Sequence, residues 1–225
     1  MTKSWIEKIT QAGTLPEVDP SQFNDPLALK TAWTPAKVGG ASFQTYKLVG
    51  SGPNRFEFKP TLGAKIFYLF FLFLGLAVLL GFVFRVIFYQ DSVWGPLIMV
   101  PFIGLVFTAL GIFLLYVGLQ PRTFDKTIGQ YWQGKQPPSP YANPAQQKSS
   151  NKASTSTPLS QVHALQIVDE YIRTKNNAYM SYEINLVLKD ASRVNVLDHA
   201  NKEKILEDAE TLANFLNVKI WNAAH

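Results

Sequence analysis

Residues 66–84 read IFYLFFLFLGLAVLLGFVF, a run of 19 residues without a charged side chain. An α-helix rises about 1.5 Å per residue, so about 20 residues cross an apolar membrane layer of about 30 Å. The run continues beyond Arg85 to Tyr89. A helix of a soluble protein normally keeps one polar face, and this stretch has none. It therefore predicts a transmembrane helix over residues 64–89.

A second uncharged run covers residues 93–119 and is 27 residues long. It predicts a second transmembrane helix over the same residues. Only residues 90–92, Gln-Asp-Ser, lie between the two runs, and so short a connection requires antiparallel neighbours. The two helices are therefore expected to form a transmembrane hairpin in the lipid bilayer.

Three glycines of the second run, Gly104, Gly111 and Gly118, recur at intervals of seven residues and so share one helical stripe. Small residues let helix backbones approach closely in membranes. Two partners for this stripe remain open. One is the first helix of the same chain, which carries small residues of its own, and the other is a second copy of the chain in a homodimer.

Charged and aromatic residues at the ends of the two runs predict the orientation of the hairpin. The tip of the hairpin, taken with the adjoining helix ends, carries one basic residue, Arg85, and two aromatic residues suited to the headgroup level, Tyr89 and Trp94. We interpret Arg85 as a side chain that extends to the outer interface, with an ion or proton relay as the alternative. Five basic residues flank the opposite ends of the helices: Arg55, Lys59, Lys65, Arg122 and Lys126. Because basic residues favour the cytoplasmic side, both termini are expected in the cytoplasm.

The composition of the 225-residue chain limits the function classes. There is no cysteine, which excludes disulfides, thiolate metal sites and cysteine nucleophiles. The net charge is +5, and basic residues near anionic headgroups account for it in a membrane protein. These residues are scattered rather than clustered in a stripe, so nucleic acid is not expected as a partner.

The residues outside the hairpin are polar and contain strand and helix patterns. Residues 1–40 are expected to be weakly ordered, because prolines interrupt them repeatedly. A β-hairpin is predicted over residues 41–62, a strand over residues 122–135, and a sheet with a C-terminal amphipathic helix over residues 159–225. The Pro-, Ser- and Gln-rich residues 136–158 predict a disordered linker.

The strands before and after the hairpin are expected to belong together. A lone β-hairpin is only marginally stable in water. The strands of residues 41–62 are therefore expected to join the later strands in one sheet, closed by the last helix. The predicted fold class is α+β, with a transmembrane hairpin inserted in a mostly antiparallel β domain.

The most distinctive soluble stretch is SYEINLVLKDASRVNVLDHAN, residues 181–201, followed by the helix pattern KEKILEDAETLANFL, residues 202–216. This arrangement resembles bacterial membrane proteins with pleckstrin-homology-like (PH-like) domains, in which a bent antiparallel sheet is closed by a C-terminal helix. It also resembles uncharacterised two-span proteins of Gram-negative bacteria. The resemblance implies a multi-pass protein of the bacterial inner membrane with a PH-like cytoplasmic domain.

Motifs that carry chemistry were sought and none is complete. Residues 129–135 fit the pattern G-x-x-x-x-G-K of a phosphate-binding loop, but Gln136 and two prolines follow where Ser or Thr and a helix are needed. The histidines His163, His199 and His225 have no further ligand at metal spacing. We therefore predict no catalytic, cofactor-binding or metal-binding residue.

These patterns favour a non-enzymatic membrane-anchored adaptor or regulator, whose cytoplasmic domain binds a protein or lipid headgroups. One alternative is an accessory subunit or assembly factor of a larger membrane complex, which would associate through the glycine stripe. The other is an enzyme or transporter component. Two helices with one peripheral charge offer no polar pathway, which disfavours transport.

Overall fold

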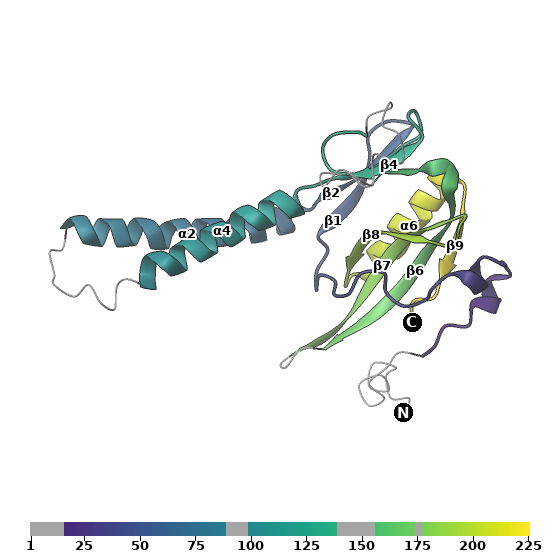
Figure 1. The fold of residues 1–225 in the computed structure, drawn as a ribbon, viewed down its shortest axis with the longest axis horizontal. Coiled ribbons are helices and arrows are strands. Elements are labelled where there is room, and N and C mark those ends of the chain that lie inside the picture. The colour runs from purple at the N-terminus through teal and green to yellow at the C-terminus, as the bar shows by residue number, and fades with distance from the viewer. Residues whose placement is uncertain (1–15, 89–98, 139–155, 174–176) are drawn as a thin grey trace.

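A computed structural model describes residues 16–88, 99–138, 156–173 and 177–225. It is a mixed α+β structure with two mostly antiparallel sheets, and two long apolar helices extend from one end of it (Figure 1). Two 3-10 helices, η1 (Pro20–Phe23) and η2 (Ala28–Lys30), precede the first strand.

The first sheet, called here the N-terminal sheet, has the order β1-β2-β3-β4-β5 with every neighbour antiparallel. Its strands are β1 (Tyr46–Gly50), β2 (Arg55–Pro60), β3 (Arg122–Asp125), β4 (Gln130–Gln133) and β5 (Ser156–Pro158). The predicted single strand over residues 122–135 is therefore two strands, separated by a turn in which Gly129 has a φ of 67°. Residues 156–158, predicted as linker, form the edge strand β5, and residues 139–155 lie outside the described residues.

The apolar helices are inserted between two neighbouring strands of this sheet. Helix α2 (Leu62–Phe88) follows β2, and α4 (Met99–Gly118) precedes β3. Since β2 and β3 pair with each other, with Phe58 opposite Arg122, the helical hairpin takes the place of a β-turn. The insertion predicted from the sequence is thus present, and only Thr61 and residues 119–121 connect it to the strands.

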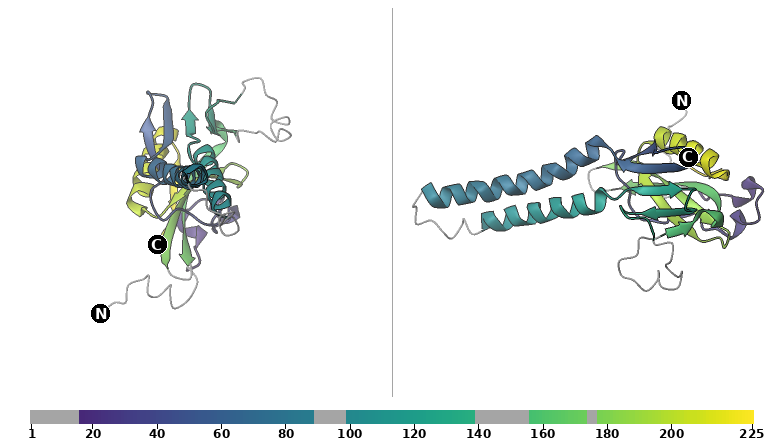
Figure 2. Two further views of the ribbon diagram at one scale, coloured as in Figure 1. Left: turned by 90° about the vertical axis from the view of Figure 1, so that its left-hand side faces the viewer. Right: turned by 90° about the horizontal axis from the view of Figure 1, so that it is seen from above.

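Both helices are long and apolar enough to cross a membrane. At 1.5 Å per residue, α2 is about 40 Å long and α4 about 30 Å. Only 11% of the most apolar window of each helix is buried within the protein. Figure 2 shows the pair projecting from the β domain, in contact with each other alone along most of their length. A core helix of a soluble protein would instead be covered by other elements.

The glycine stripe of α4 faces α2. A Cβ atom at Gly104 would approach the Leu79 side chain to 2.8 Å, and one at Gly111 would lie 2.4 Å from the backbone nitrogen of Leu72. At Gly118 the nearest atom would be a ring carbon of Tyr68, again at 2.4 Å. In this structure the first helix of the same chain therefore occupies the stripe predicted for helix packing.

The second sheet, called here the C-terminal sheet, has the order β8-β7-β6-β9. Its strands are β6 (Val162–Arg173), β7 (Ala178–Leu188), β8 (Arg193–His199) and β9 (Lys219–Asn222), and β9 alone runs parallel to its neighbour. The sequence predicted one sheet, whereas the strands divide between two. Antiparallel strands of this number twist and separate readily into packed layers.

Helix α6 (Lys202–Leu216) closes the core, as the amphipathic pattern predicted. The side chain of Asn201 accepts a hydrogen bond of 3.1 Å from the backbone N–H of Lys204 and so begins the helix, and Asn217 ends it with a φ of 58°. The main core contains residues from both sheets and from this helix. Tyr182, Ile184 and Leu186 contribute to it from alternate positions of β7, as the alternation in the sequence indicated.

The described part of the N-terminal segment differs from the weak order predicted for residues 1–40. Residues 16–41 lie across the C-terminal sheet on the side away from α6 (Figure 1). The ring of Phe23 stacks on Trp33 with centroids 4.8 Å apart, and Trp33 meets Trp221 of β9 at 5.9 Å. These aromatic contacts are the reason for the order. Residues 1–15 lie outside the described residues.

Candidate functional site at the base of the helical hairpin

A cleft of about 1100 Å³ lies where the apolar helices meet the β domain. One wall is the end of α4, residues 115–120, with Tyr68 of α2. The other walls are Tyr46 of β1, residues 133–138 after β4, and part of the N-terminal segment. Because the helices leave the sheet through very short connections, this cleft lies at the level where an apolar layer would end.

Arg122 provides the principal cationic group of the cleft. It is the first residue of β3, and its guanidinium lies 4.1 Å from the centre of the Tyr46 ring. Its Nη1 atom is buried and has no hydrogen-bond partner within the described residues. A guanidinium is a rigid fork of donors that matches carboxylate and phosphate oxygens. The side chain as a whole is only half-buried, so the guanidinium can meet a ligand in the cleft through its other atoms.

Tyr46 holds this arrangement against the end of α4. Its hydroxyl donates a hydrogen bond of 3.0 Å to the backbone carbonyl of Gly118. The side-chain amide of Gln120 similarly donates to the carbonyl of Tyr116 at 2.9 Å. The last carbonyls of a helix have no partner within the helix, so these two bonds stabilise its end and fix the wall of the cleft.

The cleft has an excess of positive charge. Its lining includes three cationic side chains, Lys37, Arg122 and Lys135, against the single carboxylate of Asp198. Burial raises the pKa of Tyr46, and raises that of Tyr131 on β4 to about 12. Both phenols are therefore neutral near pH 7 and leave the positive charge of Arg122 uncompensated.

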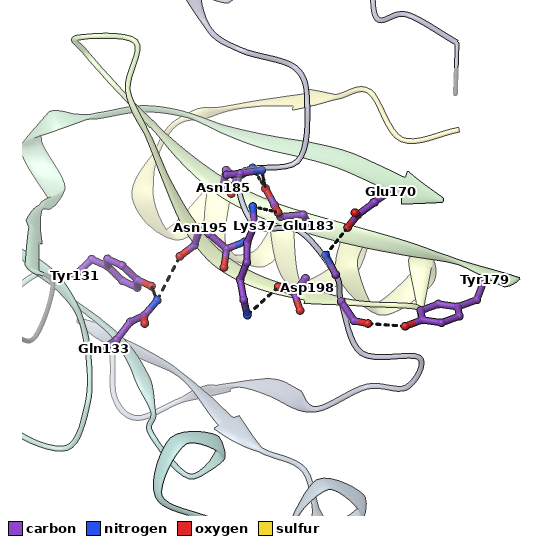
Figure 3. Close-up of polar contacts among 12 residues, drawn as sticks. Lys37, Tyr131, Gln133, Glu170, Tyr179, Glu183, Asn185, Asn195 and Asp198 are labelled. Carbon is purple, nitrogen blue, oxygen red and sulfur yellow. Dashed lines mark hydrogen bonds and ion pairs between the residues drawn. The ribbon is translucent and has the colours of Figure 1, made fainter. Parts of the chain in front are cut away.

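Polar contacts connect the cleft to the C-terminal sheet, as Figure 3 shows. The amine of Lys37 lies 3.4 Å from the carboxylate of Asp198 on β8. The side-chain amide of Gln133 donates to the hydroxyl of Tyr131 at 3.0 Å and to the backbone carbonyl of Asn195 at 3.3 Å. The cleft thus lies at the junction of the two sheets and the helical hairpin.

Other chemistry has less support in the described part of the chain. No group of three or more His, Cys, Asp or Glu residues there has the geometry of a metal site. Residues 130–133 of the G-x-x-x-x-G-K pattern form strand β4, so they make no phosphate-binding loop. His163 contacts Asp25 at 2.8 Å and His225 contacts Asp169 at 3.2 Å, each as an isolated pair.

The interface residues predicted from the sequence are only partly described. Arg85 lies in the last turn of α2 and is exposed, while Tyr89 and Trp94 lie outside the described residues. The sequence indicated Arg122 only as a flanking charge and not as a residue that lines a cleft. Its position next to the second apolar run, at the start of a strand, was the available signal.

Comparison with known proteins adds no family to this description. No protein-family model matches the chain, and no curated protein matches its sequence.

Proposed function

We propose that this chain is a non-enzymatic adaptor or regulator of the bacterial inner membrane, held there by the hairpin of α2 and α4. The exposed apolar surface of both helices supports insertion, since water would solvate it unfavourably. The basic residues before α2 and after α4 support cytoplasmic termini. Reporter fusions after His225 and within residues 89–92 test the topology. The expected signals are cytoplasmic and periplasmic, respectively, and the reverse contradicts the orientation.

The cytoplasmic domain is proposed to be PH-like and to bind anionic lipid headgroups. Two packed sheets with a C-terminal helix against them support the PH-like fold. The single observation that carries the lipid proposal is the half-buried side chain of Arg122, which lines a basic cleft at the base of the hairpin. Basic pockets at the cytoplasmic ends of membrane helices suit phospholipid headgroups. A lipid phosphate in the cleft would accept hydrogen bonds from the guanidinium.

Binding of short-chain lipids to the full chain in detergent micelles tests the headgroup proposal. The probes are dioctanoyl phosphatidylglycerol, which is anionic, and dioctanoyl phosphatidylcholine, which is zwitterionic. The variant Arg122→Gln is expected to weaken binding of the anionic lipid about tenfold, because a charge-assisted hydrogen bond contributes about 1.5 kcal/mol or more. Arg122→Lys retains the charge without the planar fork of donors. Its affinity for the anionic lipid should lie between those of the wild type and Arg122→Gln.

Lys65→Gln is the matched control for this experiment. Lys65 is exposed in the first turn of α2 and does not line the cleft, so its loss removes the same charge from the same interface. Its effect is expected to be below twofold. Equal losses for both variants would indicate general electrostatic attraction and contradict a specific site. If millimolar inorganic phosphate abolished binding of the anionic lipid, the ligand would be a soluble anion, and the lipid proposal would be contradicted.

A further inference from the structure

The outer face of the C-terminal sheet is partly polar, although it is buried, and its apolar part contains Ala164, Val187 and Trp221. Gln166 of β6 and Glu183 and Asn185 of β7 lie there, at alternate positions of their strands, and all three are buried. The covering element is the chain's own segment of residues 32–41, named here the strap. A permanently buried sheet face is normally apolar, so this composition requires an explanation.

The strap is bound through its backbone. Glu183 accepts hydrogen bonds from the backbone N–H groups of Ala36 and Lys37 at 2.9 and 3.0 Å. Glu170 accepts one from the N–H of Gly39 at 2.8 Å (Figure 3).

Three further side chains bind backbone carbonyls of the strap. Gln166 donates to the carbonyl of Ala32 at 3.0 Å, and Arg193 donates to that of Thr34 at 2.6 Å. The hydroxyl of Tyr179 donates to the carbonyl of Gly40 at 2.8 Å. All of these strap groups belong to the backbone, so the face binds peptide backbone. The strap bends at Thr34 and at residues 36–38, and Gly39 has a φ of 78°, so the face binds a bent backbone and not an extended strand.

Apart from Trp33 and Lys37, the side chains of the strap contribute little to its attachment. Val38 is 86% exposed, and Thr34, Ala36 and Gly39 are exposed as well. Uncovering the face would therefore expose groups that water can solvate and would lose little apolar contact. At the N-terminal end of the strap, Trp33 packs in the aromatic cluster. At its C-terminal end, the backbone carbonyl of Ala41 accepts a hydrogen bond of 2.9 Å from the N–H of Ala200.

We propose that this polar face is a binding groove for a peptide segment of a partner protein with the same bent backbone, and that the strap occupies it as an intramolecular ligand. Two positions define the segment that fits. A Cβ atom at Gly40 would lie 1.8 Å from Oγ of Ser181, so glycine is required there. The carboxylate of Asp198 pairs with Lys37, so a basic residue is favoured three positions earlier. This inference does not depend on lipid binding in the cleft.

The test uses the full chain in detergent micelles and a fluorescent peptide of strap residues 30–41, KTAWTPAKVGGA. The variant Gly40→Val displaces the strap and leaves every side chain of the groove in place. It is expected to bind the peptide with one-to-one stoichiometry, at least tenfold more tightly than the wild type. Adding Glu183→Gln should remove most of that gain, because it weakens the acceptor for two N–H groups. Val38→Thr, a change at an exposed position, should behave as wild type.

Hydrogen exchange of the backbone amides distinguishes a released strap from a bound one. In Gly40→Val the amides of Ala36, Lys37 and Gly39 should exchange faster while those of β7 stay protected. A released strap without peptide binding would overturn the proposal, and so would a strap that stays protected in this variant. The wild type provides a check that needs no variant. Strap amides that exchange only together with β7 would show that the strap never leaves the groove and would overturn the proposal.

Discussion

The hydroxyl of Tyr46 donates a hydrogen bond of 3.0 Å to the backbone carbonyl of Gly118, the last residue of α4. Tyr46 begins the first strand of the β domain, so this bond joins the soluble domain to the end of the helical hairpin. The same ring lies under the guanidinium of Arg122. One tyrosine therefore fixes both the helix end and the cationic group of the cleft.

Tyr46→Phe should lower the free energy of unfolding by about 1 kcal/mol, because it removes the bond to Gly118 and leaves that carbonyl without its partner. The ring remains beneath Arg122, so lipid affinity should change less than twofold. Thermal unfolding of the full chain in micelles measures the first effect. Tyr116→Phe is the control, since Tyr116 is on the same helix and 71% exposed. Equal effects of the two variants would contradict a specific role for the bond.

Gly111→Ala should destabilise the hairpin by about 1 to 3 kcal/mol. The added Cβ atom would lie 2.4 Å from the backbone nitrogen of Leu72, so α2 must move away. Gly81→Ala is the matched control, because a Cβ atom there meets nothing within 4 Å. The midpoint of unfolding in a titration with sodium dodecyl sulfate should fall for the first variant only. Unchanged stability of Gly111→Ala would contradict close packing at this glycine.

The sequence predicted the parts of the fold that depend on local patterns. The apolar runs, the alternation around Ile184 and the helix begun by Asn201 are each visible within a few residues. The backbone contacts of residues 32–41 join positions more than 100 residues apart, and no periodicity in the sequence encodes them. The division into two sheets was hidden for the same reason. Arg122 looked like any flanking charge because its partner, the Tyr46 ring, comes from the opposite side of the hairpin insertion.

Trp33→Ala should loosen the N-terminal segment without unfolding the sheets. Trp33 stacks on Phe23, and its Nε1–H donates to the carbonyl of Ala28 at 3.0 Å. Aromatic pairs contribute about 0.5 to 1.5 kcal/mol beyond the area they bury. Limited proteolysis of bonds before residue 41 should accelerate about tenfold. Leu29→Ala removes a side chain that is 64% exposed and should leave the cleavage rate unchanged.

The pH dependence of stability should report two buried groups with opposite signs. Burial raises the pKa of Asp208 on α6 from 3.8 to about 6. The folded state then binds more protons than the unfolded state between these values, so stability falls as pH rises through this window. Burial lowers the pKa of His199 from 6.5 to about 4. The stability that depends on neutral His199 is fully present above pH 6.5 and is lost as pH falls toward 4.

The contribution of each group to the pH dependence of stability can be removed by a single substitution. Asp208→Asn should stabilise the full chain by about 1 to 2 kcal/mol above pH 6 and have little effect near pH 4. The profile of this variant should rise with pH, because His199 then acts alone. In the folded protein, Nδ1 of His199 accepts a hydrogen bond of 3.2 Å from the backbone N–H of Asn201. His199→Asn retains an acceptor for that N–H, and the stability of this variant should fall as pH rises from 4 to 6. Unfolding by urea at intervals of half a pH unit measures both. If Asp208→Asn shows the wild-type slope, the carboxyl of Asp208 is ionised normally in the folded protein.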